Sequence, residues 1–330
     1  MKQFLQKKAK LVFLCMLVLL TCTACANPRG RDGKTLADQI IASEETTIDA
    51  SKINYKDISD KKLKKEIKKN IKDGQYTIQP TTFKNSMSKG WFEGLIVWPI
   101  AQIINLISSK TDAGVGIILT TLLIQMLVFV FTRKSQMSTQ RMQEIQPEIQ
   151  KIQNKYKDKT DERSKMQMAQ EMQNIYQKYD IHPFGSMLIT FIQLPIMMGM
   201  YYATMRSVSV VSGSFMGISL AGTPLDGFKA FDIAYISIYV LMVIFYIVSM
   251  KLPQWLKKWQ DKKDNVKVKK YAQEETNPMA NSMNMSMYFM TAMICIMYIS
   301  WPMAMSFYWL ISSVIRVCQS LILHKVMNKK

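Results

Sequence analysis

Long apolar stretches alternate with polar, basic stretches along this chain of 330 residues. A helix rises 1.5 Å per residue, so about 20 apolar residues cross the hydrocarbon core of a bilayer. Five stretches come close to that length: 114–132, 185–205, 231–250, 283–301 and 304–323. The pattern therefore predicts an all-α, polytopic membrane protein with five transmembrane helices.

The N-terminus has a shorter apolar run with a different character. Lysines precede the apolar residues 11–20, and small residues and cysteines follow them, which is typical of a secretory signal peptide covering residues 1–24. The stretch LTCTAC resembles a bacterial lipobox, in which the first cysteine of the mature protein receives a lipid. Cys25 fits this pattern better than Cys22, which stays as the alternative lipidation site.

Basic residues are concentrated in alternate connections between the predicted spans. The connections 133–184 and 251–282 carry ten and eight Lys or Arg residues, whereas the connection 206–230 carries only Arg206 and Lys229. By the positive-inside rule, the basic connections and the basic tail 324–330 lie in the cytoplasm. The segment 25–90 is then extracytoplasmic, and its lysine-rich part is expected to be a solvated helix or a tether that binds no nucleic acid.

Two further segments are predicted to be amphipathic helices. Residues 91–109 are interrupted by Glu93 and Pro99, so they are expected to lie in the outer interface with Trp91 and Trp98 as anchors. The connection 133–184 is expected to form a cytoplasmic helical hairpin, because apolar residues recur there at steps of three and four. These residues are Met142, Ile145, Ile149, Ile152, Met168, Met172, Ile175 and Tyr179.

The usual catalytic patterns are missing from the sequence. The chain has only two histidines and lacks the H-E-x-x-H, P-loop and G-x-S-x-G patterns. Asp232 is the only acidic residue in a predicted span, which disfavours carboxylate-driven proton coupling. The sequence therefore predicts no enzyme, no metal site and no cofactor.

Arg316 lies within the last predicted span. An arginine at the centre of a membrane helix costs roughly 2.5–3.5 kcal/mol, and Arg316 is roughly 10 Å from the end of the span at Leu323 at 1.5 Å per residue. No carboxylate in any span is placed to pair with it, since Asp232 lies at the outer end of the third span, and this leaves water as its partner. The polar residues that would line a hydrated groove open to the cytoplasm are Thr121, Gln125, Thr190, Gln193, Ser312, Ser313 and Gln319. Each polar pair by itself is also consistent with a hydrogen bond between helices.

Several stretches together resemble one known family. They are WPIAQIINLI, GVGIILTTLLIQMLVFVFT, IQPEIQKIQNKYK, QEMQNIYQKYDIHPFG, IQLPIMMGMY and WPMAMSFYWLISSVIRVCQ, spread over about 90–325. In this order they resemble the YidC/Oxa/Alb membrane protein insertases in their Gram-positive, five-span lipoprotein form. The resemblance implies five spans around a hydrophilic groove, nascent membrane protein clients in the lipid bilayer, and the Sec translocon and the ribosome as partners. It implies no cofactor.

The groove arginine of that family falls on Gln125 in this sequence, so the expected charge is absent there. Arg316 occupies a position where the relatives usually have Ser or Thr facing the groove. We therefore expect that the positive charge has moved from the first span to the fifth. The alternative for the same residue is a binding site in a transporter or channel for a small anion.

Overall fold

The computed structural model describes residues 28–157, 159, 161–181, 183–263, 288–289 and 291–327, without the side chains of 143, 144, 146, 147, 150, 183–191 and 261. The predicted signal peptide, Cys22 and Cys25 lie outside the described residues. The chain divides into two compact units. The first unit comprises Met1–Gly116 and Ile196–Ala221, and the second comprises Ile117–Pro195 and Gly222–Lys330.

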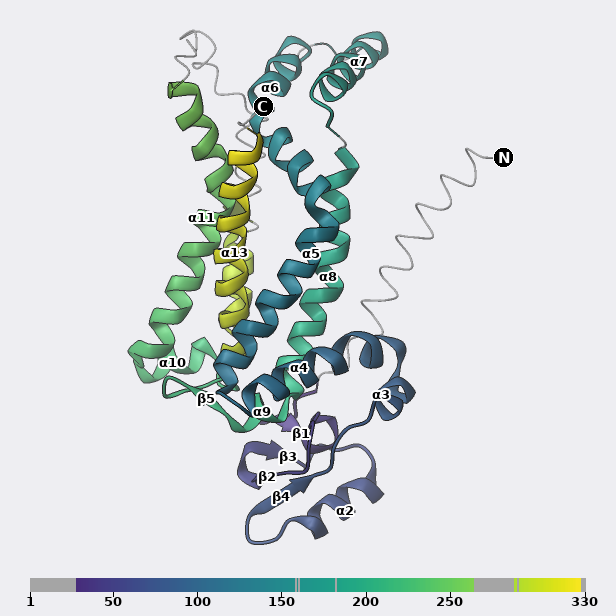
Figure 1. The fold of residues 1–330 in the computed structure, drawn as a ribbon, viewed down its shortest axis with the longest axis vertical. Helices are drawn as coiled ribbons and strands as arrows, with labels where there is room; N and C mark the ends of the chain where they lie inside the picture. The colour runs from purple at the N-terminus through teal and green to yellow at the C-terminus, as the bar shows by residue number, and fades with distance from the viewer. Residues whose placement is uncertain are drawn as a thin grey trace, which may run out of the picture. The chain divides into compact units, whose positions relative to one another are not determined.

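Long helices dominate the part of the chain that contains the predicted spans (Figure 1). They are α5 (Ala113–Glu144), α8 (Pro183–Arg206), α11 (Ile233–Lys263) and α13 (Met303–Met327). Among the described residues, the segments Ala113–Met142, Ile233–Gln260 and Met303–Val326 are long and apolar enough to cross a membrane. Residues 291–298 of the fourth predicted span are also helical. Three of the five predicted spans are thus supported by length and composition.

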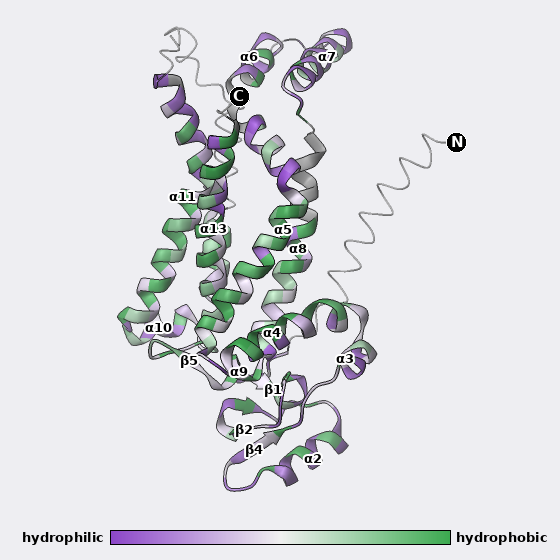
Figure 2. Ribbon diagram, in the orientation of Figure 1, coloured by the Kyte–Doolittle hydropathy of each residue, from purple (hydrophilic) through white to green (hydrophobic). Residues whose placement is uncertain are grey.

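The helices α5 and α11 extend well beyond the apolar stretches that predicted them. Figure 2 shows both helices changing from apolar to polar towards their C-terminal ends. The polar residues 133–144 and 251–263 belong to predicted connections, but in the structure they are part of the two helices. They continue the helices because they are rich in Lys, Arg and Gln, which favour helix formation without needing an apolar environment.

Hydrogen bonds and packing hold the ends of the last helices together in the second unit. α13 packs along α11 (Figure 1), and the Tyr239 hydroxyl donates to the carbonyl of Cys295 at 2.7 Å. The short helix α10 (Pro224–Ala230) begins with a capping box formed by Thr223 and Asp226. In its first turn, the Leu225 amide donates a hydrogen bond to the Ile299 carbonyl at 3.0 Å. Ile299 directly follows the helical residues 291–298. These bonds satisfy backbone groups at helix ends that would otherwise lack partners.

The predicted hairpin is formed by α6 (Gln146–Lys155) and α7 (Glu162–Lys178). The helix that Met142, Ile145, Ile149 and Ile152 predict is not continuous, since α5 ends at Glu144 and α6 starts after Ile145. The two amphipathic faces bury each other, as expected for faces of this spacing. Their cluster contains Met142, Ile145, Ile149, Met172, Ile175, Tyr176, Tyr179 and Ile181.

The first unit contains short strands, which corrects the expectation of an all-α chain. β1 (Thr35–Leu36) pairs in parallel with β3 (Ile53–Asn54), and β2 (Thr46–Asp49) pairs antiparallel with β4 (Gln75–Ile78). β5 (Ser214–Phe215) and β6 (Ile218–Ser219) form a third pair. The helical elements are η1 (Ala37–Gln39), η2 (Ala50–Lys52), α2 (Lys61–Asn70), α3 (Phe83–Lys89), the π-helix η3 (Glu93–Val97), α4 (Trp98–Ser108) and α9 (Val208–Ser212).

The segment 28–90 is folded, and its lysine-rich part forms a helix, which is one of the two alternatives that the sequence left open. Its isolated apolar residues converge on one core, which also receives Val208 and Val211 from α9. The lysine-rich stretch forms α2, in which Leu63 and Ile67 lie one turn apart and pack on this core while the lysines remain outside it. The core brings together residues that are far apart in the sequence, which explains why no local pattern predicted it.

Candidate functional site

A cavity of about 230 Å³, lined mainly by polar residues, lies within the second unit. The four long helices contribute its lining: Gln125, Val128, Gln136, Thr139, Gln140, Gln193, Ser249, Pro253, Arg316, Gln319, Ser320 and Leu323. Such a set of amide and hydroxyl groups is unusual among helices that are apolar enough to cross a membrane, because unpaired polar groups in hydrocarbon are costly. The cavity is therefore the candidate functional site of this unit.

Arg316 is the charged residue in this lining. Its guanidinium donates to the Ser313 hydroxyl at 2.9 Å. The guanidinium carbon also lies 5.6 Å from the ring centre of Trp309 and 5.9 Å from that of Tyr246. Rings at this distance attract a cation but do not neutralise it. Within the described residues, no carboxylate oxygen comes within ion-pair distance of Arg316.

Two glutamines connect other helices to α13 near this charge. The Gln125 amide donates to the Ser312 hydroxyl at 3.2 Å, and the Gln193 amide donates to the Tyr308 hydroxyl at 3.1 Å. Ser312 lies one turn before Arg316 on α13, so Gln125 and Arg316 line the same cavity from two helices. The position where the resemblance expects an arginine therefore lies close to the arginine that this chain has.

The other predicted groove residues are placed in different ways. Gln319 lines the cavity, and Ser313 is buried beneath Arg316. Thr121 is buried, but its hydroxyl donates to the Ile117 carbonyl of its own helix at 2.7 Å and does not line the cavity. Thr190 lies in α8, and its side chain is outside the described residues.

Sequence reasoning missed the part of the cavity that α5 contributes beyond residue 132. Gln136, Thr139 and Gln140 line the cavity from the polar extension of this helix. They continue the steps of three and four residues that start at Gln125 and Val128, which place side chains on one helix face. These steps can be read in the sequence, but the apolar stretch that predicts the first span ends at residue 132, before the helix ends at Glu144.

Comparison with known proteins places the chain in a family. The family model described as "60Kd inner membrane protein" matches residues 105–330, which is more than half of the chain. The chain belongs to this family. The match confirms the resemblance to the YidC/Oxa/Alb insertases, and the 60Kd inner membrane protein family together with the apolar helices makes the chain a membrane-embedded protein.

Relatives in this family are named membrane protein insertases. "Membrane protein insertase YidC 1" of Streptococcus pyogenes serotype M1 is 30% identical over 237 residues, or 72% of this chain and 75% of the relative. "Membrane protein insertase MisCA" of Bacillus subtilis strain 168 is 26% identical over 72% of this chain and 80% of the relative. "Membrane protein insertase YidC" of Oceanobacillus iheyensis is 28% identical over 74% and 87%. These names describe insertion and no covalent reaction, in agreement with the prediction that the chain is not an enzyme.

Proposed function

We propose that this protein inserts membrane protein clients into the plasma membrane and assists their folding. The observation that carries the proposal is the polar cavity among apolar helices, with Arg316 lacking a carboxylate partner in the described part of the chain. The insertase names of the relatives support the same function. In this proposal the cavity is a hydrated groove that receives the polar part of a client during its passage.

The charge of Arg316 lowers the barrier for acidic client segments. Bringing an aspartate to the centre of a membrane helix costs roughly 2.5–3.5 kcal/mol. An opposite charge at 4 Å, in surroundings with an effective dielectric constant of about 20, contributes about 4 kcal/mol. The two terms are of similar size, so one arginine in a wet cavity offsets most of the cost for one acidic residue. A client then enters the membrane without any chemical energy source in this chain.

The proposed topology has five spans, with the C-terminus in the cytoplasm. The hairpin of α6 and α7 then lies in the cytoplasm, where it receives nascent clients. The basic residues of the connection 251–282 and of the tail 324–330 can contact ribosomal RNA, and the Sec translocon is the other proposed partner. Lipidation of Cys25, with Cys22 as the alternative, anchors the N-terminus outside.

We further propose that Arg316 replaces the family's groove arginine, which is absent at Gln125. The shared cavity and the Gln125–Ser312 hydrogen bond support this relocation, because a charge on either helix would reach the same space. Arg316→Ala is expected to abolish insertion of a client with an acidic exported tail. Adding Gln125→Arg to that variant is expected to restore part of the activity.

The experiment follows labelled small membrane proteins in cells depleted of the native protein and supplied with each variant. Arg316→Lys serves as the charge-preserving control, and a client whose exported tail lacks acidic residues serves as the second control. Full insertion of the acidic client by the Arg316→Ala variant would refute the relocation. Loss of both clients in that variant would point to a structural role for Arg316.

A transporter or channel for a small anion is the alternative, because the same cavity offers an accessible positive charge. Purified protein in liposomes separates the two functions. Anion flux that depends on Arg316, without any defect in client insertion after depletion, would favour the alternative and overturn the insertase proposal.

A further inference from the structure

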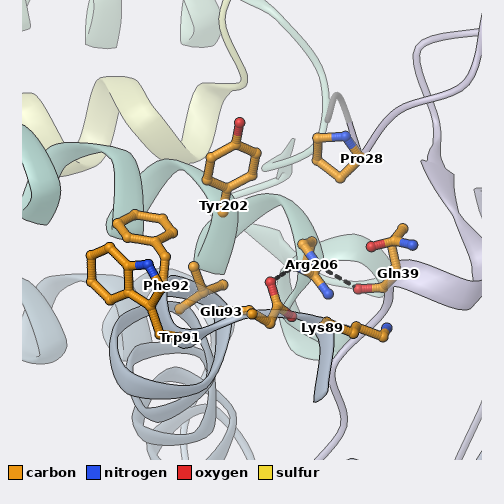
Figure 3. A pocket seen from close by; sticks show the side chains of 10 residues that line it. Pro28, Gln39, Lys89, Trp91, Phe92, Glu93, Tyr202 and Arg206 are labelled. Atoms are coloured by element: carbon orange, nitrogen blue, oxygen red, sulfur yellow. Dashed lines mark hydrogen bonds and ion pairs between the residues drawn. The ribbon is translucent and has the colours of Figure 1, made fainter. Parts of the chain in front are cut away.

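The first unit contains a second pocket, of about 530 Å³, that the insertase proposal does not use. Its lining residues are Pro28, Gln39, Lys89, Gly90, Trp91, Phe92, Glu93, Val97, Tyr202 and Arg206. Figure 3 shows the aromatic side chains of Trp91 and Phe92 on one side of the pocket and the polar side chains of Gln39 and Lys89 on the other side. Pockets of this size and mixed polarity are typical ligand sites.

Arg206 is a polar residue of the pocket lining, and its side chain is almost fully buried. Its side chain is 5% exposed, and that of its ion-pair partner Glu93 is 14% exposed. Arg206 Nε donates to the Gln39 carbonyl at 2.6 Å, and Nη1 donates to Glu93 Oε2. The pair thus joins the end of α8 to η3, and the bond to Gln39 joins it to the last residue of η1. Burial of such a pair is favourable only when the remaining polar atoms are also satisfied.

Two buried atoms of this pair have no hydrogen-bond partner among the described residues. They are Arg206 Nη2, which is a donor, and Glu93 Oε1, which is an acceptor. Leaving such atoms unpaired in a buried site is unfavourable, and more so for charged groups. A ligand that accepts from Arg206 and donates to Glu93 would satisfy both atoms.

Lys89 adds a second positive charge at the exposed side of the pocket. Its ammonium donates to the Asp38 carbonyl at 3.1 Å. Burial lowers the pKa of the Lys89 ammonium, and the positive charge of Arg206 lowers it further, against the opposing effect of Glu93 and Asp38. An anion between Lys89 and Arg206 would relieve this repulsion between the two cations.

The surface next to the pocket is apolar and exposed. Trp91, Leu95 and Leu106 are 49%, 56% and 59% exposed, respectively. Their spacings of four and eleven residues place them on one face of the helical stretch 91–108. Trp91 belongs both to this face and to the wall of the pocket. An exposed apolar face of this kind on a membrane protein is suited to contact lipid.

We propose that this pocket binds the headgroup of an anionic phospholipid. The phosphate accepts hydrogen bonds from Arg206 Nη2 and Lys89 Nζ, and a hydroxyl of the headgroup donates to Glu93 Oε1. Trp91, Phe92 and Tyr202 pack against the glycerol backbone and the first carbons of the acyl chains, which continue along the exposed apolar face. The continuity of the pocket with that face identifies a lipid, rather than free phosphate, as the source of the anion.

The test measures lipid binding to the full chain in detergent by native mass spectrometry. Phosphatidylglycerol and phosphatidylcholine with identical acyl chains are compared, and inorganic phosphate is added as a competitor. Phosphatidylglycerol is expected to bind more tightly, and millimolar phosphate is expected not to displace it. Lys89→Gln is expected to weaken phosphatidylglycerol binding about three- to tenfold, as for the loss of one partly exposed charge-assisted contact.

Lys84→Gln is the matched control, because Lys84 is exposed on the same helix α3 and does not line the pocket. Equal binding by the Lys89→Gln and Lys84→Gln variants would overturn the proposal, as would equal binding of the two lipids. Displacement of the lipid by phosphate would overturn the lipid as the source of the anion. Client insertion is not part of this readout, so the proposal can fail without the insertase function failing.

Discussion

Asn105 is a buried side chain whose amide joins three segments of the first unit. It is 1% exposed. Its Nδ2 donates to the Ile41 carbonyl at 2.9 Å, and its Oδ1 accepts from the Ser207 hydroxyl at 2.5 Å and from the Ser209 amide at 3.2 Å. In the sequence Asn105 was a polar interruption of an apolar stretch. In the structure it fixes the position of α4 against its neighbours.

Removing this amide should destabilise the first unit. Asn105→Ala leaves the Ser207 hydroxyl and the Ser209 amide without their acceptor, so we expect a loss of about 2–3 kcal/mol. A thermal melt of the full chain in detergent, followed by circular dichroism, should show a lower midpoint. Asn85→Ala is the control, since Asn85 is exposed, and equal midpoints for the two variants would contradict the assigned role.

Single residues show where prediction from sequence reached its limit. Arg316 stood out because a charge is costly in an apolar helix, and the sequence already indicated that it has no carboxylate partner, as is the case among the described residues. The hydrogen bond between Gln125 and Ser312 could not be predicted, because it depends on the rotation of two helices that are separated by 187 positions in sequence. Periodicity identifies the polar face of one helix but does not specify which residue it meets.

At the scale of elements, the presence of a helix could be predicted where an apolar stretch or an apolar periodicity was long. The residues at which the helices end could not be predicted. Both α5 and α11 continue past their apolar stretches, since a helix ends where its backbone loses hydrogen-bond partners and not where hydropathy changes. The strands of the first unit are two to four residues long. Such strands are too short for alternation to be recognised.

The carboxylate of Glu171, a titratable group on α7, joins α7 to the end of α6 at the surface of the hairpin. Glu171 Oε1 accepts from Lys155 Nζ at 2.5 Å and from the Tyr156 hydroxyl at 2.9 Å. The hydrogen bond from Lys155 lowers the pKa of Glu171 below its ordinary value, and that from Tyr156 lowers it further. The contribution of Glu171 to hairpin stability is therefore present above the unfolded-state pKa, and it is lost as the pH falls through the folded-state pKa.

Hydrogen exchange of the full chain should reveal this dependence. Amides of α6 and α7 are expected to lose protection on acidification from pH 7 to about pH 3, after correction for the intrinsic exchange rate. In the Glu171→Gln variant the protection should be lower at pH 7 and should change less with pH. Identical pH profiles for the two proteins would show that the contact does not stabilise the hairpin.

At the scale of the whole molecule, the distribution of charge predicts the orientation in the membrane. Lysines and arginines number 43 against 24 acidic residues, and those in the short connections cluster in 133–184 and 251–282. Moving these cations across the bilayer during insertion is unfavourable, so the positive-inside rule predicts that they stay in the cytoplasm. The apolar helices are consistent with either orientation, because length and composition are the same in both directions.

Cysteine labelling in intact cells tests the orientation directly. Cys295 and Cys318 are replaced by alanine, and one probe is introduced at an exposed position, either Lys229→Cys in α10 or Lys165→Cys in α7. A membrane-impermeant maleimide should label the Lys229→Cys protein in intact cells, because α10 belongs to the connection with few cations. It should label the Lys165→Cys protein only after the membrane is permeabilised, and a protein without a probe measures the background. Labelling of Lys165→Cys in intact cells would place the hairpin outside, where it could not receive clients from the cytoplasm, and would contradict both the topology and the proposed route of insertion.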